Sequence, residues 1–361
     1  MPKKSLLMIG VFLLATTIWA ALPRVSNPSP DYQTQPTNDG SHVEKIRAVW
    51  PGPNPEDRVR ARVVMSGEDI IFEDGPTSQV MNTHSIRKSL LSLIYGIAID
   101  QGLIDLEATL QELGIDENIP LTNQEKSATV RNLLMYRSGI YLPAAGEHDS
   151  QITDRPAREE HEPGEYFFAN NFDANALGTI FIQETGYELG PFMEEFLATP
   201  LGLQDFDANN VIMGDPWFWP SQDTRHLQYY VYMSARDLAR IGAMVAQDGQ
   251  WGGRKVIPKD WIELITAPHS DLEESHVPNH LYSHFGFQWW FQEETGTVWA
   301  NGYGEHFLMV DPTHDLVLVE RNFSGNSLLS TARWLSSGNK FSGSLWELID
   351  THAMLVKISD S

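Results

Sequence analysis

The stretch Ser85-Ile86-Arg87-Lys88 stands at the head of the run SLLSLIYGIAID, residues 89–100, which is apolar on nearly every helical face. Such a run predicts a buried helix that begins near Ser85. Positions three apart share one face of a helix, so the Ser85 hydroxyl and the Lys88 amine can meet. A serine becomes a nucleophile when a base takes its proton, and a lysine with a lowered pKa can be that base. The alternative is a plain helix cap with an exposed lysine, because this tetrad is common.

Composition bounds what the chain can do. Its 361 residues are enough for a large core, and 48 acidic against 25 basic residues give a net charge of -23. A surface of this sign is a poor match for phosphate backbones, so we expect no nucleic-acid partner. The chain has no cysteine, which excludes disulfides, thiolate metal sites and a cysteine nucleophile. The compartment stays open on this ground, because exported proteins need no disulfides.

The N-terminus predicts export. Lys3 and Lys4 precede an apolar run that continues to about Leu22, so residues 1–22 are expected to be a signal peptide or an N-terminal membrane anchor. Bulky Ile18 and Trp19 fit a cleavage site poorly, and both alternatives stay open. Residues 23–43 are expected to be a linker and residues 44–361 the folded domain. The body of the protein would then be periplasmic or extracellular, with the N-terminal segment as its only contact with a membrane.

Strand and helix patterns divide the chain into three parts. A hairpin is expected near the N-terminus, helices in the middle, and strands followed by one last helix near the C-terminus. Ser234 is expected to cap a helix with Asp237 as its partner. The predicted fold is α+β, an α/β sandwich whose antiparallel sheet is built from both termini and flanked by helices, with an inserted helical lobe. The segments are the hairpin 60–65 and 69–72, helices 129–135 and 172–184, the loop 142–165, strands 287–292, 306–310 and 316–320, and helix 344–356.

Several ordered motifs give the sequence a family resemblance. They include HSIRKSLLS at 84–92, GLIDL at 102–106, VRNLLMYRSG at 130–139, PG at 163–164, NNFD at 170–173, MSARDLAR at 233–240, GFQWW at 286–290 and VDP at 310–312. In this order the chain resembles the serine β-lactamase and penicillin-binding-protein superfamily. It is most similar to the class C-like branch, which holds esterases, D-amino-acid peptidases and 6-aminohexanoate-dimer hydrolases. The resemblance covers about residue 44 to the C-terminus and implies the β-lactamase/transpeptidase fold.

The resemblance implies roles for named residues. Ser-x-x-Lys of the family matches Ser85 and Lys88. The asparagine of its Tyr-x-Asn motif matches Asn171, which would orient lysine and substrate, whereas the tyrosine position is Ala169. Its Lys-Thr-Gly motif falls on Ala300-Asn301-Gly302 without the basic residue. By analogy, Asn301, Gly302 and Tyr303 would bind substrate, and the backbone amides of Ser85 and of a residue near Tyr303 would form the oxyanion hole.

The missing tyrosine leaves three hypotheses. Lys88 acts alone as the base, as other Ser-Lys hydrolases show is possible. Another side chain substitutes, with Tyr166, Tyr303 and His306 as the nearby candidates in sequence. Or the protein is a weak or inactive relative, because losing a proton shuttle costs about 100- to 10,000-fold in rate. Small Ala169 and Ala174 leave room for an outside side chain or a bulky substrate.

Other clusters of histidine and aromatic residues give weaker evidence of a functional site. His276, His280 and His284 have helical spacing for a metal, but Pro278 interrupts it, so we expect no metal site and no cofactor. Trp217-Phe218-Trp219-Pro220 is either a small core under a loop or a wall of the cleft. Trp289 and Trp290 alternate faces of a strand, so at most one of them faces a cleft.

The sequence thus predicts a serine hydrolase that cleaves an ester, amide or peptide bond of a small molecule through a Ser85 acyl-enzyme, with Lys88 as base. We expect poor β-lactam hydrolysis, because the third motif lacks a cation for the lactam carboxylate. The competing class is a binding protein that holds a peptide or amide ligand without cleaving it.

Overall fold

The computed structural model describes residues 40–51, 60–214, 224–272, 281–322 and 344–360. The expected signal or anchor at 1–22, most of the linker 23–43, and the aromatic cluster 217–220 lie outside these ranges. None of the described helices is long and apolar enough to cross a membrane.

An eight-stranded antiparallel sheet organises the molecule, in the order β2-β1-β13-β12-β11-β10-β9-β8. Its first two strands come from the N-terminal part of the chain and the other six from the C-terminal part, where Arg60 on β1 pairs with Asn322 on β13. The prediction of one sheet built from both ends is therefore confirmed. The strands are β1 Arg60–Ser66, β2 Asp69–Asp74, β8 Ser270–Asp271, β9 His284–Phe285, β10 Trp290–Gln292, β11 Thr297–Gly302, β12 His306–Asp311 and β13 Leu316–Asn322.

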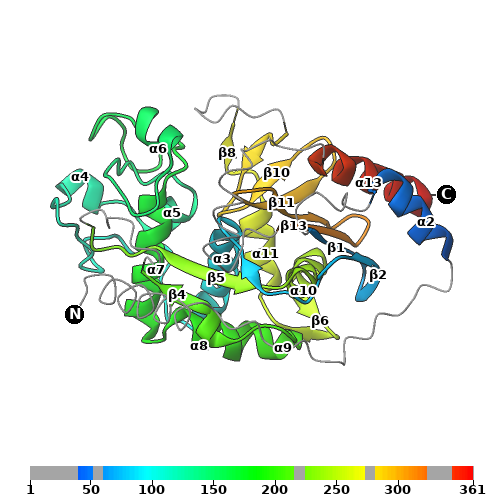
Figure 1. The fold of residues 1–361 in the computed structure, drawn as a ribbon. Coiled ribbons are helices and arrows are strands. Elements are labelled where there is room, and N and C mark those ends of the chain that lie inside the picture. The colour runs from blue at the N-terminus through cyan, green and yellow to red at the C-terminus, as the bar shows by residue number, and fades with distance from the viewer. Residues whose placement is uncertain (1–39, 52–59, 215–223, 273–280, 323–343, 361) are drawn as a thin grey trace, which may run out of the picture.

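Side chains of each strand alternate between two cores, because successive residues of a strand point to opposite faces. On β13, Val317 and Val319 join the main core, whereas Leu316 and Leu318 join a second core. Helices α3 (Ile86–Asp100) and α10 (Ala235–Ala246) contact the sheet on the main-core side. Helices α2 (Gly40–Val49) and α13 (Ser344–Ser359) lie side by side over the other face (Figure 1).

The segment between β2 and β8 contains α3 and α10, which pack on the sheet, and the helical lobe, which is mostly cyan and green in Figure 1, with α11 in yellow. Short strands β3-β5-β4 and β6-β7 pair within it. Its elements are β3 Met81–Asn82, α4 Asn123–Lys126, α5 Val130–Leu134, α6 Asp149–Thr153, α7 Asn171–Thr185, α8 Leu189–Met193, a π-turn Glu194–Ala198, α9 Thr199–Leu201, a 3-10 turn Ala208–Asn210, β4 Val211–Met213, β5 Tyr229–Met233, β6 Gln250–Trp251, β7 Arg254–Lys255 and α11 Lys259–Thr266.

Three sequence expectations need correction in detail. The predicted loop 142–165 contains the short helix α6, which sequence periodicity does not reveal. The predicted strand 287–292 begins only at Trp290, because Gln288 has a left-handed φ of 65° that interrupts extended backbone. The Ser234 hydroxyl caps α10 as expected, accepting from the Asp237 N–H at 3.1 Å, but the Asp237 carboxylate instead accepts from the backbone N–H groups of Gln204 and Asp205.

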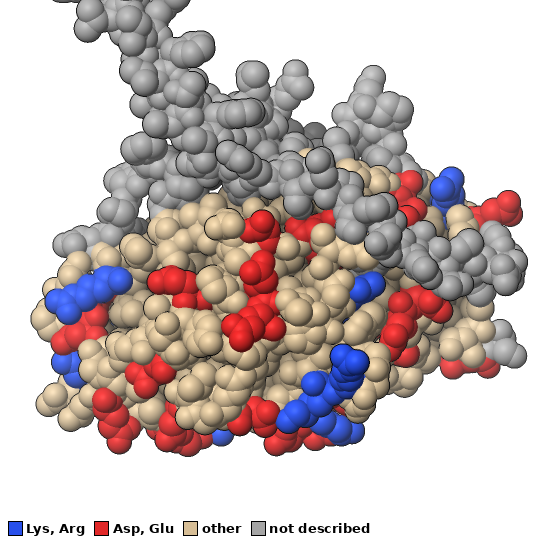
Figure 2. All heavy atoms as spheres, turned by 90° about the horizontal axis from the view of Figure 1, so that it is seen from below, with Lys and Arg blue, Asp and Glu red and all other residues tan. Residues whose placement is uncertain are grey.

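Acidic side chains are spread over the face of the molecule shown in Figure 2, and basic ones gather at a few places on it. This distribution agrees with the net charge of -23. A surface of this kind favours solubility through self-repulsion.

Candidate active site

A strained turn presents Ser85 at the start of α3. Thr83 is fixed to β5, because its N–H and its hydroxyl both donate to the Val231 carbonyl, at 2.9 and 2.8 Å. His84 follows with a left-handed φ of 49°, and its N–H donates to Asn82 Oδ1 at 2.8 Å. Ser85 is exposed, and its hydroxyl makes no capping bond to α3. The turn therefore leaves this hydroxyl accessible at a helix N-terminus.

The sheet holds the same turn from below. Buried Arg321 on β13 donates to the carbonyls of Met81 and Asn82, at 3.2 and 2.8 Å. Gly302, at the end of β11, approaches so closely that a Cβ there would lie 2.6 Å from the Thr83 carbonyl oxygen. Only glycine allows this approach, so the third-motif position and the Ser85 turn are brought together by backbone contact.

Lys88 lies one turn into α3 with its amine directed to the lobe. Its Nζ donates to Asn171 Oδ1 at 2.9 Å and sits 5.5 Å from the centre of the Tyr136 ring. Burial, aided by the neighbouring Arg87 charge, lowers the pKa of Lys88 well below its usual value, although Asp173 acts in the opposite direction. A lysine in this setting can hold a neutral amine that accepts a proton.

Asn171 connects this amine to the loop opposite. Asn171 begins α7, and its Nδ2 donates to the Gly146 carbonyl at 2.5 Å. Asn175, one turn on, donates to the Ala145 carbonyl at 3.1 Å. The two asparagines thus fix the loop 145–146 against the helix that orients Lys88.

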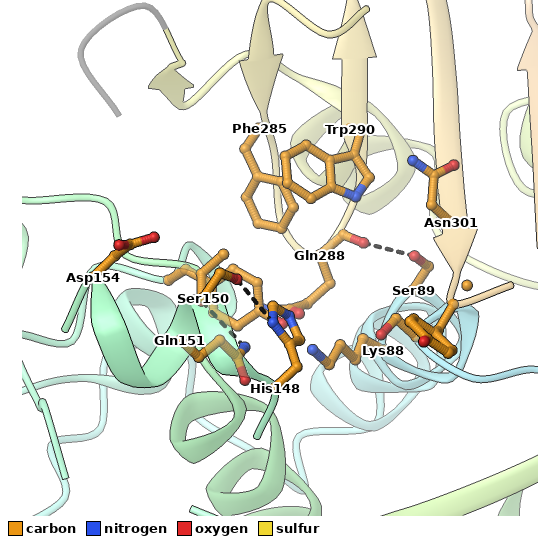
Figure 3. A pocket seen from close by; sticks show the side chains of 15 residues that line it. Lys88, Ser89, His148, Ser150, Gln151, Asp154, Phe285, Gln288, Trp290 and Asn301 are labelled. Carbon is orange, nitrogen blue, oxygen red and sulfur yellow. Dashed lines mark hydrogen bonds between the residues drawn. The ribbon is translucent and has the colours of Figure 1, made fainter. Parts of the chain in front are cut away.

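These elements enclose a cavity of about 380 Å³ (Figure 3). Its lining comes from α3, the lobe and strands β9, β10 and β11 of the sheet. The lining residues are Ser85, Lys88, Ser89, Tyr136, His148, Ser150, Gln151, Asp154, Ala169, Phe285, Gln288, Trp290, Asn301, Gly302 and Tyr303.

One wall of the cavity is aromatic. The Tyr136 ring stacks on Phe285 with centroids 5.2 Å apart, and Trp290 packs edge-on to Phe285 at 4.8 Å. Trp290 lines the cavity while Trp289 is fully buried, as their alternation predicted. This wall suits an apolar group of a ligand.

Amides form the polar part of the lining. Asn301 donates through Nδ2 to the Tyr282 hydroxyl, and its buried Oδ1 has no hydrogen-bond partner among the described residues. The Gln288 side chain donates through Nε2 to the Leu134 carbonyl at 2.9 Å. The main-chain carbonyl of Gln288 accepts from Ser89 Oγ at 2.6 Å. A nucleophile candidate, a lysine and neutral amides around an apolar space can bind and attack a carbonyl compound.

Comparison with known proteins agrees with this geometry. The sequence model of the Beta-lactamase family matches residues 76–319, more than half of the chain. The chain belongs to the beta-lactamase family. An uncharacterized protein of Alkalihalophilus pseudofirmus is 24% identical over 280 residues, which cover 71% of this chain and 77% of that protein.

Two further relatives of this beta-lactamase family member have named activities. A 6-aminohexanoate-dimer hydrolase of Paenarthrobacter ureafaciens is 32% identical over 94 residues, 25% of this chain and 24% of that enzyme. The crystal structure of a family VIII carboxylesterase superimposes with a TM-score of 0.57 at 15% identity, covering 82% of this chain and 96% of that one, which shows a shared fold. The protein is thus a beta-lactamase family member, with a 6-aminohexanoate-dimer hydrolase among its relatives and a carboxylesterase among the proteins that share its fold.

The structure brings most of the predicted site residues together. The same cavity is lined by Ser85, Lys88, Asn301, Gly302 and Tyr303, and Asn171 binds the Lys88 amine there. Tyr303 is 51% exposed at the rim.

Two proposed substitutes for the missing tyrosine lie elsewhere. The Tyr166 ring stacks on His161, with centroids 4.4 Å apart, and does not line the cavity. His306 is fully buried, and its Nδ1 accepts from Arg321 Nε at 2.8 Å. Ring stacking and the buried arginine therefore account for these two side chains.

Sequence reasoning missed His148 and Tyr136, which both line the cavity. A signal was present for the first: His148 lies in the 24-residue segment 142–165, and loops longer than about 15 residues are often functional. Among the described residues, no group of three or more acidic or histidine side chains is arranged to hold a metal ion.

Proposed function

We propose that this protein is a serine hydrolase that cleaves an ester or amide bond through an acyl-enzyme on Ser85, with Lys88 as base. The neutral Lys88 amine takes the Ser85 proton, and Oγ bonds to the substrate carbonyl carbon. The oxyanion then collapses, the bond to the leaving group breaks, and water later releases the acyl group. The Ser85 N–H at the start of α3, together with the Tyr303 N–H, is the proposed oxyanion hole.

One observation carries this proposal. The Ser85 hydroxyl is exposed to the same cavity as a lysine whose amine is held by Asn171 and whose pKa is lowered by burial. An exposed lysine of ordinary pKa would be charged and could not accept the proton at neutral pH. The combination of both groups in one cavity favours nucleophilic catalysis over a simple helix cap.

The lining favours a short apolar acyl group over a β-lactam. Tyr136, Phe285 and Trp290 offer an apolar surface, whereas the basic side chains among the lining residues are only Lys88 and His148. A lactam carboxylate needs a fixed cation, such as an arginine, and none lines the cavity in the described part of the chain. We therefore propose an esterase or amidase with little β-lactamase activity.

Labelling with a fluorophosphonate tests the proposal. The intact protein is incubated with the probe, and the mass of the Ser85 peptide is compared between wild type and Ser85→Ala. A covalent mass gain on Ser85 that disappears in the variant supports the enzyme. No gain in either protein rejects it. Turnover of p-nitrophenyl butyrate and of nitrocefin then separates an esterase from a lactamase.

An inactive, ligand-binding family member is the second candidate, and Ala169 in place of the tyrosine is the observation that favours it. It predicts that wild type binds an amide or peptide with no labelling of Ser85. The same experiment distinguishes the two functions.

A further inference from the structure

The cavity contains a second base besides Lys88. His148 precedes α6 in the lobe, whereas Lys88 belongs to α3, and both side chains line the same space. Figure 3 shows the two groups reaching toward each other from these separate elements. They are close enough for the Lys88 charge to lower the pKa of His148. The site thus has two nitrogen bases facing one nucleophile.

The loop that carries His148 is built into the site. Asn171, which binds the Lys88 amine, also holds the Gly146 carbonyl two residues before His148. Glu147 next to it is almost fully buried and forms an ion pair with Arg155. Gly146 has a left-handed φ of 75°, and a Cβ there would meet Gln228 at 1.9 Å. The backbone immediately before His148 is therefore held by these contacts.

One ring nitrogen of His148 is held and the other is free to react. Nδ1 and the Ser150 hydroxyl form a hydrogen bond of 2.8 Å. When Ser150 accepts this bond from Nδ1–H, Nε2 keeps its lone pair. Nε2 has no hydrogen-bond partner among the described residues. An imidazole oriented through one nitrogen and open at the other is the usual arrangement of a general base.

The cavity has room for this histidine because residue 169 is small. Ala169 lines the same cavity as His148, at the position where the family motif has its tyrosine. Gln151, on α6, donates to the Ala169 carbonyl at 3.3 Å and so ties the helix after His148 to that position. An aromatic side chain at 169 would therefore border the same cavity that His148 lines.

We propose that His148 is the second catalytic proton-transfer group of this site, in place of the missing tyrosine. This inference rests on the proposed function. Lys88 takes the Ser85 proton and passes it to His148 Nε2, which gives it to the leaving oxygen or nitrogen as its bond to the acyl carbon breaks. In deacylation Nε2 takes a proton from water, the hydroxide bonds to the acyl carbon, and the proton returns through Lys88 to the departing Ser85 Oγ.

The protonation state of His148 suits this role. Partial burial, and then a positive charge on Lys88 whenever that amine is protonated, lower the pKa of His148, while Asp149 and Glu147 oppose the shift. The imidazole is then neutral at neutral pH and ready to accept a proton. Of the two tyrosines in the lining, Tyr303 lies at the rim and is 51% exposed, whereas Tyr136 has a buried hydroxyl with no hydrogen-bond partner in the described structure, and burial raises the pKa of Tyr136 well above the usual value. It would be a poor base.

The test compares esters that differ in leaving group. A p-nitrophenolate leaves without a proton, whereas an ethoxide needs one. We expect His148→Gln to lower kcat/KM for ethyl butyrate roughly 100-fold or more, and that for p-nitrophenyl butyrate much less. Fluorophosphonate labelling of Ser85 should remain within about threefold of wild type, since fluoride also leaves unprotonated. Ser150→Ala should give a smaller loss with the same leaving-group pattern.

His161→Gln is the matched control, because His161 lies in the same loop but stacks on Tyr166 outside the cavity. It should leave all three readouts unchanged. Equal activity of His148→Gln and wild type on both esters would overturn the inference. So would an equal loss on both esters, which would indicate a structural role. Failure of wild type to label would instead reject the proposed hydrolase itself.

Discussion

At the scale of single residues, the proposed mechanism depends on whether Lys88 carries a proton. A positive charge on Lys88 costs free energy, because the side chain is buried and lies close to Arg87. Asn171 accepts one of its hydrogen bonds without supplying a negative charge. A carboxylate in the place of Asn171 would hold the amine charged, so a neutral partner is the chemistry that a lysine base requires.

Lys88→Arg tests this account. A guanidinium cannot give up its proton near neutral pH, so it can still donate to Asn171 but cannot act as a base. We expect turnover of p-nitrophenyl butyrate to fall about 100- to 10,000-fold. The wild-type rate should rise with pH as Lys88 loses its proton. This rise should occur at a lower pH than the deprotonation of an exposed lysine. Lys259 is an exposed lysine paired with Asp248, so Lys259→Arg is the matched control and should leave turnover unchanged.

Tyr136→Phe separates packing from chemistry on the aromatic wall. The ring packs on Phe285, but its buried hydroxyl has no partner in the described structure. Removing an unsatisfied buried hydroxyl relieves a desolvation cost, so thermal unfolding should occur at the same or a higher temperature. Activity should stay within about threefold, whereas a general base would cost 100-fold or more. A large loss of turnover with unchanged stability would show that Tyr136 takes part in the reaction.

The sequence could predict that Ser85, Lys88 and Asn171 lie together, because each lies in a local pattern. His148 could not be placed, because hydrogen bonds from Asn171 and Asn175 to a distant loop decide its position. Small Ala169 showed that a side chain was missing but not what replaces it. The geometry of a site completed by a loop depends on tertiary contacts, which residue spacing alone does not contain.

At the scale of elements, α7 combines a site residue with a buried acid. Asp173 lies two residues after Asn171, and its Oδ1 accepts from the Ser138 hydroxyl at 2.6 Å. Its Oδ2 is buried and unpartnered among the described residues. Burial raises the pKa of Asp173 to about 8, outweighing the hydrogen bonds from Ser138 and Asn170. The Asp173 carboxyl in the first turn of α7 is therefore protonated at neutral pH.

Asp173→Asn should remove a pH-dependent penalty. The native carboxyl keeps its proton to about pH 8, whereas the unfolded one loses it near pH 4. Wild-type stability should thus fall as pH rises through this window and level off above it. The advantage of the amide, measured by urea unfolding at pH 5 and pH 9, should be larger at pH 9. An equal effect at both values would contradict the raised pKa.

Asp116→Asn is the control of opposite sign. Its carboxylate accepts from Lys126 at 2.8 Å and from two backbone N–H groups, which lower its pKa to about 2. A lowered pKa means stability that is present above about pH 4 and lost as pH falls. This variant should be destabilised at pH 7, with a smaller effect at pH 3.

Among the elements, alternation along the strands made the sheet predictable from both ends of the chain. Val317, Leu318 and Val319 alternate between two cores as their pattern required. Gln288 was not predictable, because its left-handed φ is fixed by bonds to the carbonyls of Leu133 and Leu134. Local propensity failed where long-range hydrogen bonds set the backbone.

At the scale of the whole molecule, the sheet separates the main core, which contains α3 and the candidate site, from a second core under α13. The Ser85 helix α3 packs on the main-core side, against strands β11 and β12. The second core lies on the other face, where α13 covers Phe307 and Leu318 with Leu348 and Leu355. His352 on α13 adds a 2.7 Å hydrogen bond to buried Asp311. Mutations that lower stability through this layer should therefore leave turnover unchanged.

Leu348→Ala tests that independence. The side chain is fully buried in the second core, so its removal should lower the free energy of unfolding by about 2–5 kcal/mol. The value of kcat/KM per folded molecule should stay within about twofold, because Leu348 does not line the cavity, although the lining residue Trp290 packs against the second core. Trp346→Ala is the matched control on the same helix. That residue is 63% exposed, and its loss should change stability by about 0.5 kcal/mol or less. A drop in kcat/KM for Leu348→Ala, measured well below its unfolding temperature, would show that the sheet transmits packing changes to Ser85 and that the two layers are coupled.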